Sequence, residues 1–394
     1  MTHEVVELRP ETPHPQNTAS QSDEPVTGGT GPGPDVWQPQ TLIAPAPAAP
    51  STGWRRALYR MTSGAVNPGP SAAEAARSEL RAEVAAPVAR RAGERIAVLS
   101  TKGGVGKTTT TLMLGHTLAA ERGDRVVALD ANPDYGTLGY RVAPTTSATV
   151  RELLAARADL VSYRDVRAYT TQAPSRLEVV PGDADPEVSE AFTAQDYADA
   201  QAVLGQHYNL VLTDCGTGVL HDAMRAVLAM ATQLVVVTGP AVDQARHADH
   251  LLRWLRAHAR PDQVDDAVVV VNASRNDLAV DLDPLFAHFA GLVRAVIEIP
   301  YDPVLAAGGI DGLDALATLT RDAYLSLARA VTLGFSAGPP RSLGPTADSA
   351  HSPTGPGVPL SGRGPDAPTA PVPPPAPPPP DLSGHQPGGP SHTA

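Results

Sequence analysis

Apolar positions in the middle of the chain gather into short runs that do not alternate with polar positions. The runs are rich in Val, Leu and Ile, and glycine or polar turns follow most of them. Continuous runs of this length are typical of parallel strands that are buried on both faces of a sheet. The predicted strands are residues 95–100, 125–130, 177–180, 210–214, 233–238, 267–272 and 293–300.

Longer stretches with helical periodicity separate most of these runs. They cover residues 107–121, 196–206, 221–231, 242–259 and 313–333. Regular alternation of strand and helix predicts an α/β fold, with a doubly wound and mostly parallel sheet of about seven strands. Ligands of such folds bind at the carboxyl ends of the strands, so the site is expected there.

Two helical segments are predicted ahead of the sheet. In GWRRALYRM (residues 53–61), Trp54, Leu58 and Met61 share an apolar face, whereas the arginines lie on the opposite face. This short basic amphipathic element either docks on the globular part of the chain or anchors it to a membrane or a partner. Ser71 and Glu74 have the spacing of a capping box, which predicts a second helix up to about residue 86.

Proline divides the chain. Of the 41 prolines, 13 precede residue 93 and 18 follow residue 336, so only the middle has the composition of a packed domain. We therefore expect a disordered Pro-rich tail at 1–52, the helical lead-in at 53–92, a globular domain at 93–336 and a Pro-rich disordered tail at 337–394. The run PVPPPAPPPP near the end is a polyproline II segment by composition, either a spacer or a docking site.

Charge and cysteine content exclude several classes of protein. The formal charge of −12 gives no general attraction to nucleic acid or anionic lipid. The single cysteine, Cys215, excludes an intrachain disulfide framework. No apolar run is long enough for a membrane span, and the acidic, Pro-rich start does not resemble a secretory signal. We expect a cytoplasmic protein.

The distribution of lysine indicates a site before any motif is considered. The chain has 30 cationic residues, and only Lys102 and Lys107 are lysines. A preference for arginine explains the rest of the surface, but it does not explain two lysines in one short stretch. A compact ammonium group fits among phosphate oxygens in a tight loop, where a planar guanidinium does not.

Both lysines lie in TKGGVGKTTTT, which follows the strand at 95–100 and opens a predicted helix. This is the context of a phosphate-binding loop, whose backbone N–H groups and helix N-terminus attract phosphate oxygens. A plain glycine-rich turn would leave the two lysines unexplained. The backbone groups expected to bind the phosphates are those of Gly103, Gly104, Val105 and Gly106.

Three side chains of the same motif have expected roles. Lys107 would bridge the β- and γ-phosphates of ATP. Thr108 would offer its hydroxyl to Mg²⁺, and Thr109 would contact the α-phosphate. The expected cofactors are therefore ATP and Mg²⁺.

The sequence KGGVGKTT resembles the deviant phosphate loop of the MinD/ParA family, whose additional lysine corresponds to Lys102. The resemblance implies that Lys102 reaches the partner's nucleotide across a face-to-face homodimer, which forms on ATP. Thr101 stands where an ordinary phosphate loop has glycine, a variation found in this family. The resemblance extends over roughly residues 94–334.

Further residues match the family pattern. By resemblance, Asp214 in LVLTDCGTG would hold the magnesium shell through water, and Gly218 would sense the γ-phosphate. Asn272 would read adenine, with Pro300 and Asp302 near the purine. An asparagine after a strand is also a common turn residue, so both interpretations of Asn272 stay open.

The pattern departs from the family at LDANPDYGTLG. The family has two aspartates here, one near magnesium and one that positions the attacking water, whereas this chain has Asp130 and Asn132. An amide orients water but accepts no proton, so hydrolysis is expected to be slow or to use Asp134. Asp134 as an ordinary turn residue is an equal alternative.

More narrowly, the lead-in, the DANPDYGTLGYR loop and the Pro-rich flanks resemble actinobacterial MinD-like ATPases associated with type VII (ESX) secretion. This resemblance implies an ATPase whose ATP-gated dimer positions or regulates a larger assembly. Asn132 motivates an alternative, a nucleotide-gated binding module with negligible hydrolysis. A DNA-partitioning ATPase is disfavoured, because residues 240–334 carry 8 arginines against 13 acidic residues.

Overall fold

The computed structural model describes eight stretches of the chain, which are residues 48–87, 93–132, 136–183, 192–218, 222–258, 261–273, 281–308 and 312–335. The segments expected to form the two Pro-rich tails lie outside them, apart from residues 48–52. Asp134 also lies outside the described residues.

The centre of the structure is an eight-stranded sheet with the order β3-β4-β2-β5-β1-β6-β7-β8. All neighbouring pairs are parallel except β3 and β4, which confirms the predicted doubly wound α/β class. No sequence pattern indicated β3, because two residues are too few to form one. The strands are β1 (Glu94–Leu99), β2 (Val126–Ala131), β3 (Thr171–Gln172), β4 (Glu178–Val180), β5 (Leu210–Cys215), β6 (Gln233–Thr238), β7 (Val268–Asn272) and β8 (Ala295–Ile299).

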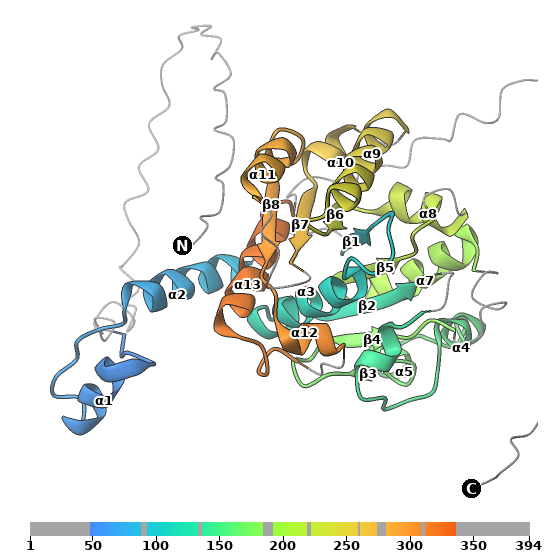
Figure 1. Ribbon diagram of the computed structural model, residues 1–394. Coiled ribbons are helices and arrows are strands. Elements are labelled where there is room, and N and C mark those ends of the chain that lie inside the picture. Colours follow the sequence, from blue (N-terminus) through green and yellow to red (C-terminus); the bar gives the residue numbers. More distant parts are fainter. Residues whose placement is uncertain are drawn as a thin grey trace, which may run out of the picture. The chain divides into compact units, whose positions relative to one another are not determined.

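Helices cover both faces of this sheet (Figure 1). One face packs against α3 (Lys107–Glu121) and α13 (Thr318–Thr332), and α2 (Ala72–Ala85) lies against these two helices. The remaining helical elements are α1 (Gly53–Met61), η2 (Leu138–Arg141), α4 (Val150–Ala155), α5 (Tyr163–Arg167), α7 (Ala194–His207), α8 (Asp222–Met230), α9 (Val242–His258), α10 (Pro261–Asp265), α11 (Asp283–Ala290) and α12 (Pro303–Ala307). Of these, α4, α5 and α7–α11 cover the other face.

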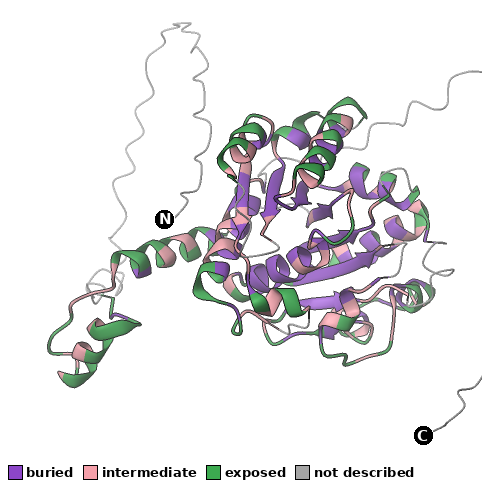
Figure 2. Ribbon diagram, viewed as in Figure 1, coloured by how far each residue is buried: buried purple, intermediate pink, exposed green. Residues whose placement is uncertain are grey.

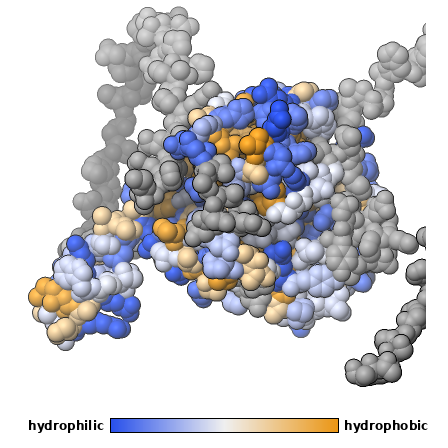
Figure 3. Space-filling model, in the orientation of Figure 1, coloured by the Kyte–Doolittle hydropathy of each residue, from blue (hydrophilic) through white to orange (hydrophobic). Residues whose placement is uncertain are grey.

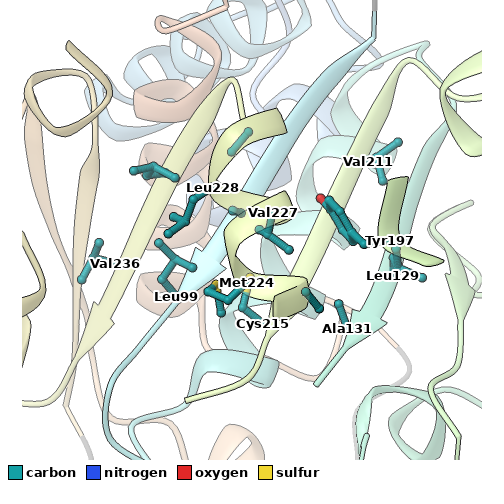
Figure 4. Packing of buried hydrophobic residues seen from close by; sticks show 14 of the residues in the cluster. Leu99, Leu129, Ala131, Tyr197, Val211, Cys215, Met224, Val227, Leu228 and Val236 are labelled. Atoms are coloured by element: carbon teal, nitrogen blue, oxygen red, sulfur yellow. The ribbon is translucent and has the colours of Figure 1, made fainter. Parts of the chain in front are cut away.

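The core consists of the strand side chains and the helix faces that meet them. Every residue of β2, β5 and β6 is buried, as expected for strands covered on both sides (Figure 2). Figure 4 shows the packing on one face, where Met224 and Leu228 of α8 lie over Leu99 of β1. This rigid sheet fixes the positions of the polar residues at its carboxyl edge.

The second lead-in helix, α2, is part of the folded domain. Its predicted capping box is present, since the Ser71 hydroxyl accepts a hydrogen bond from the Glu74 N–H at 3.2 Å. Arg77 of α2 pairs with Asp322 of α13 at 2.5 Å, and Val84 is fully buried. The helix therefore docks through both charge and apolar contact.

The first lead-in helix, α1, behaves differently. None of its nine residues is buried, and Trp54 and Met61 are 67% and 84% exposed. Apolar side chains gather over this helix in Figure 3. Hydrogen bonds from the Ser51 and Thr52 hydroxyls to the Glu74 carboxylate, at 2.6 and 2.7 Å, fasten the chain just before it. The apolar face is thus exposed in the structure, and its role as a docking or anchoring surface stays a prediction.

Within the described residues, no helix combines the length and the apolar character needed to cross a bilayer.

Candidate nucleotide-binding site

The loop between β1 and α3 has the backbone shape of a phosphate cradle. Gly104 and Gly106 adopt left-handed conformations, with φ of 77° and 89°. A Cβ on Gly106 would approach the Asn272 amide nitrogen to 2.6 Å, so only glycine fits there. A Cβ on Gly103 or Gly104 would meet nothing within 4 Å, so space is open beside the loop. The helix N-terminus that follows favours an anion in that space.

Two side chains from the start of α3 converge on Asp214. The Lys107 ammonium group lies 2.8 Å from Oδ1 of Asp214, and the Thr108 hydroxyl donates to Oδ2 at 2.7 Å. The lysine and aspartate side chains are 8% and 1% exposed. This contact follows from the fold, because β5 lies beside β1 and brings Asp214 next to the loop.

A second carboxylate, that of Asp130, lies at the same edge of the sheet. Its strand β2 pairs with β5 so that Asp130 and Asp214 are partners in register. The N–H groups of Asn132 and Leu138 donate to the Asp130 carboxylate at 3.1 and 3.0 Å. Burial and the negative charge of Asp214 nevertheless raise the pKa of Asp130 to about 7.

The donor set at this edge suits Mg²⁺. Thr108, Asp130 and Asp214 supply a hydroxyl and two carboxylates, which are the oxygen ligands that this hard cation takes. Among the described residues no group of three or more His, Cys, Asp or Glu gathers. Such a small acidic set fits an ion that keeps waters and shares its coordination with phosphates, as Mg²⁺ commonly does in nucleotide sites.

A cleft of about 360 Å³ extends from the loop toward β7 and β8. Its lining includes Gly106, Thr109, Asn272, Pro300 and Asp302. The structure thus brings together the loop and the three residues expected near the base. Aliphatic and aromatic side chains contribute the rest of the wall, among them Ile299, Tyr301 and Leu305.

Asn272 and Asp302 also have structural partners. The Asn272 amide donates to the Val105 carbonyl oxygen at 2.8 Å, which fixes the buried turn of the phosphate loop. The Asp302 carboxylate accepts the N–H groups of Val304 and Ala317, both at 2.9 Å. Burial alone would raise the pKa of Asp302, but these N–H groups hold it below its ordinary value. Their roles toward the purine stay predictions.

Lys102 lies on the outer rim of the loop. Its ammonium group pairs with Asp243 near the start of α9, and the two side chains are 40% and 58% exposed. Gly218 is exposed beyond the end of β5 and is not among the residues that line the cleft. Their expected roles, in the dimer and at the γ-phosphate, remain predictions.

Sequence reasoning missed Arg141. This residue ends η2, lines the cleft and donates from Nη1 to the Thr109 hydroxyl at 2.9 Å. It ends the DANPDYGTLGYR loop, but an arginine in a short turn has no diagnostic spacing that would assign it a role. Only the fold places it beside the phosphate loop.

A glycine-rich strand-to-helix loop, with a lysine and a threonine facing an acidic strand end, defines the P-loop class of nucleotide-binding proteins. Residues 96–314, more than half of the chain, match the model of the CobQ/CobB/MinD/ParA nucleotide binding domain. The chain belongs to this family.

Two relatives locate the chain within the family. It is 37% identical over 289 residues to the ESX-1 secretion-associated protein EspI of Mycobacterium tuberculosis, covering 72% of this chain and 42% of that protein. The chain thus spans less than half the length of EspI. It is 27% identical over 207 residues to the septum site-determining protein MinD of Bacillus subtilis, covering 50% of this chain and 73% of MinD. These matches confirm the resemblance inferred from the sequence.

Solved structures agree on the fold. A ParA family ATPase from Chlorobium tepidum superposes with a TM-score of 0.52 at 19% identity, covering 61% of this chain and 98% of that one. The cell division ATPase MinD of Pyrococcus furiosus gives 0.50 at 22% identity, covering 61% and 99%. At these identities the likeness concerns the fold alone.

Proposed function

We propose that the chain is a MgATP-binding and hydrolysing ATPase of the cytoplasm, whose ATP-gated homodimer positions or regulates a larger assembly. The single observation that carries this proposal is the buried convergence of Lys107 and Thr108 on Asp214 behind the glycine-rich loop. In the proposed site Lys107 turns from Asp214 to the β- and γ-phosphates, while Thr108, Asp130 and Asp214 hold Mg²⁺. The metal would offset the negative charge of the phosphates.

Hydrolysis would depend on the segment after β2. Asn132 follows Asp130 and would orient the attacking water through its amide, without taking a proton. Slow turnover is therefore part of the proposal, with Asp134 as the carboxylate that could assist. The alternative function, a nucleotide-gated binding module without turnover, is favoured by the same asparagine.

Single-turnover hydrolysis separates these two functions. The wild-type protein should hydrolyse MgATP faster than a Lys107→Ala control, and Asn132→Asp should increase the rate by at least about tenfold, because a carboxylate can accept the proton of water. Wild-type turnover equal to that of the control would leave only the binding module. A loss of rate in Asn132→Asp would contradict the role given to Asn132.

The dimer and its assembly are further parts of the proposal. Lys102 projects from the rim of the loop and would contact the nucleotide of a partner subunit. The similarity to EspI, which is named for ESX-1 secretion, supports a type VII secretion apparatus as the assembly. A pull-down with protein trapped in the ATP state should recover secretion components; recovery of nucleic-acid partitioning proteins instead would point to a ParA-like role.

Nucleic acid is not expected to be a partner. Residues 240–334 carry 8 arginines against 13 acidic residues, which disfavours a DNA-binding face. A salt-sensitive gel shift of DNA in the presence of ATP would reverse this conclusion.

Membrane contact, if it occurs, would use α1. Its exposed Trp54 and Met61 and its three arginines suit an anionic surface. Co-sedimentation with anionic liposomes in the presence of ATP, lost in Trp54→Glu, would support this contact. Absence of sedimentation would reject membrane contact and would favour a protein partner for α1.

A further inference from the structure

Arg141 lies between the proposed metal site and the phosphate loop. It closes η2, the short turn whose Leu138 N–H donates to the Asp130 carboxylate. From the same turn, Nη1 of Arg141 donates to the Thr109 hydroxyl at 2.9 Å. One turn of chain therefore contacts both a residue of the proposed metal site and a residue of the phosphate loop.

The Thr109 hydroxyl can serve two partners at once. A hydroxyl has one proton to donate and two lone pairs that accept. Because Arg141 already occupies one lone pair, the proton of Thr109 remains available for an anionic oxygen. Arg141 has further N–H donors in the same planar group, and these are also able to donate to an anion.

The surroundings of Arg141 also suit a phosphate. Its side chain is half-buried and lines the cleft beside Gly104 and Gly106 of the loop. Within the part of the chain that the structure describes, Arg141 forms no ion pair with a carboxylate. A guanidinium held in a cleft by a neutral hydroxyl keeps most of its charge available to an anion.

We propose that Arg141 binds the α-phosphate of the nucleotide together with Thr109. This inference rests on the proposed nucleotide-binding function and adds a contact outside the phosphate-loop motif. Since ATP and ADP share the α-phosphate, Arg141 contributes equally to the binding of both. It holds the nucleotide whether or not the γ-phosphate is present, in contrast to the groups proposed to face the γ-phosphate.

The test is a calorimetric titration of the full chain with MgADP and MgATP. Arg141→Gln should weaken both by about tenfold, the usual effect of losing one charge-assisted hydrogen bond to phosphate. The matched control is Arg167→Gln, because Arg167 also donates to a threonine hydroxyl, that of Thr170 at 3.0 Å, but does not line the cleft. The control should bind both nucleotides as the wild type does.

A second measurement reports on the α-phosphate itself. In the two diastereomers of ADPαS, sulfur replaces one or the other non-bridging α-oxygen. Arg141→Gln should change the ratio of the two affinities by at least about threefold, because one of these oxygens loses its partner. Adenosine, which has no phosphate, should bind the variant and the wild type alike.

The outcomes are distinguishable. Failure of the wild-type protein to bind MgADP and MgATP would reject the proposed function itself. Wild-type binding with an unchanged ADPαS ratio in Arg141→Gln, or an equal loss for ADP and adenosine, would reject the role of Arg141 alone. If Arg141→Gln does not fold, Arg141→Lys replaces it; this variant keeps the charge but not the planar group, and its ADPαS ratio must still differ from that of the wild type.

Discussion

The two lysines of the phosphate loop occupy opposite environments. Lys107 is buried and pairs with a buried carboxylate, that of Asp214. Lys102 is only five residues away in the sequence, yet it is 40% exposed and pairs with the more exposed Asp243. A buried charge is costly to leave without its partner. An exposed ion pair contributes little to stability, and its members exchange partners easily. Lys107 is therefore suited to its own site, and Lys102 to a contact between molecules.

The largest expected effect follows from the buried lysine. Lys107→Ala should weaken MgATP binding by at least about a hundredfold, because it removes the cation nearest the phosphates and leaves Asp214 buried without its partner. Lys107→Arg should fail as well, since the guanidinium does not fit the cradle. Isothermal titration would measure both variants. Binding by Lys107→Arg close to that of the wild type would show that charge alone matters.

The exposed lysine should give a different result. Lys102→Ala should bind MgATP within about threefold of the wild type and should lose ATP-dependent association, because its side chain faces outward rather than into its own site. Light scattering with and without ATP would measure the association. Asp243→Ala serves as the control, as it removes the exposed partner but keeps the lysine. Unchanged association of Lys102→Ala would exclude this residue from the dimer.

The smallest effect concerns the second carboxylate of the buried region. The pKa of Asp130 is raised to about 7, so the folded, nucleotide-free protein favours the protonated side chain. The resulting contribution to stability is complete below about pH 4, the ordinary aspartate pKa, and is lost as the pH rises from about 4 to about 7. Asp130→Asn should therefore raise the free energy of unfolding at pH 8 by about 1–3 kcal/mol and should flatten this pH dependence. Denaturant unfolding at pH 5 and pH 8 would measure both.

Asp302→Asn provides the contrasting control for that experiment. The pKa of Asp302 is held below its ordinary value by backbone N–H groups, so its stabilising effect is present at neutral pH and is lost as pH falls toward acid. Its replacement should lower the stability at pH 8. A similar response of both variants would mean that the two carboxylates do not differ as the structure indicates.

Much of the fold could be predicted from the sequence. Helix α3 begins at the predicted residue, Lys107, because the glycines and the start of the helix are local signals. The buried strands were found because an apolar run between turns is also local. The short helices α4, α5, α10, α11 and α12 and the strand β3 were missed, since each is too short to show a clear period.

The site was predictable where it depends on the loop and less so elsewhere. Asp214 was expected at this edge of the sheet by resemblance to the family, but its contact with Lys107 was not predicted, because it depends on β5 lying beside β1. The positions of Arg141 and Asp243 depend on tertiary contacts between elements far apart in the chain, and no local pattern reports such contacts. The exposure of α1 could not be predicted either, because an amphipathic pattern fits an exposed helix and a docked helix equally well.

The docking of α2 changes where the domain begins. The family match starts at residue 96, but the chain already folds against the domain at α2, where Val84 is fully buried and its carbonyl oxygen accepts a hydrogen bond from Arg122. A fragment that begins at β1 would expose the apolar surface that Val84 now covers. It would also leave Asp322 without its partner Arg77. The folded domain of this protein therefore begins earlier in the chain than the family match at residues 96–314.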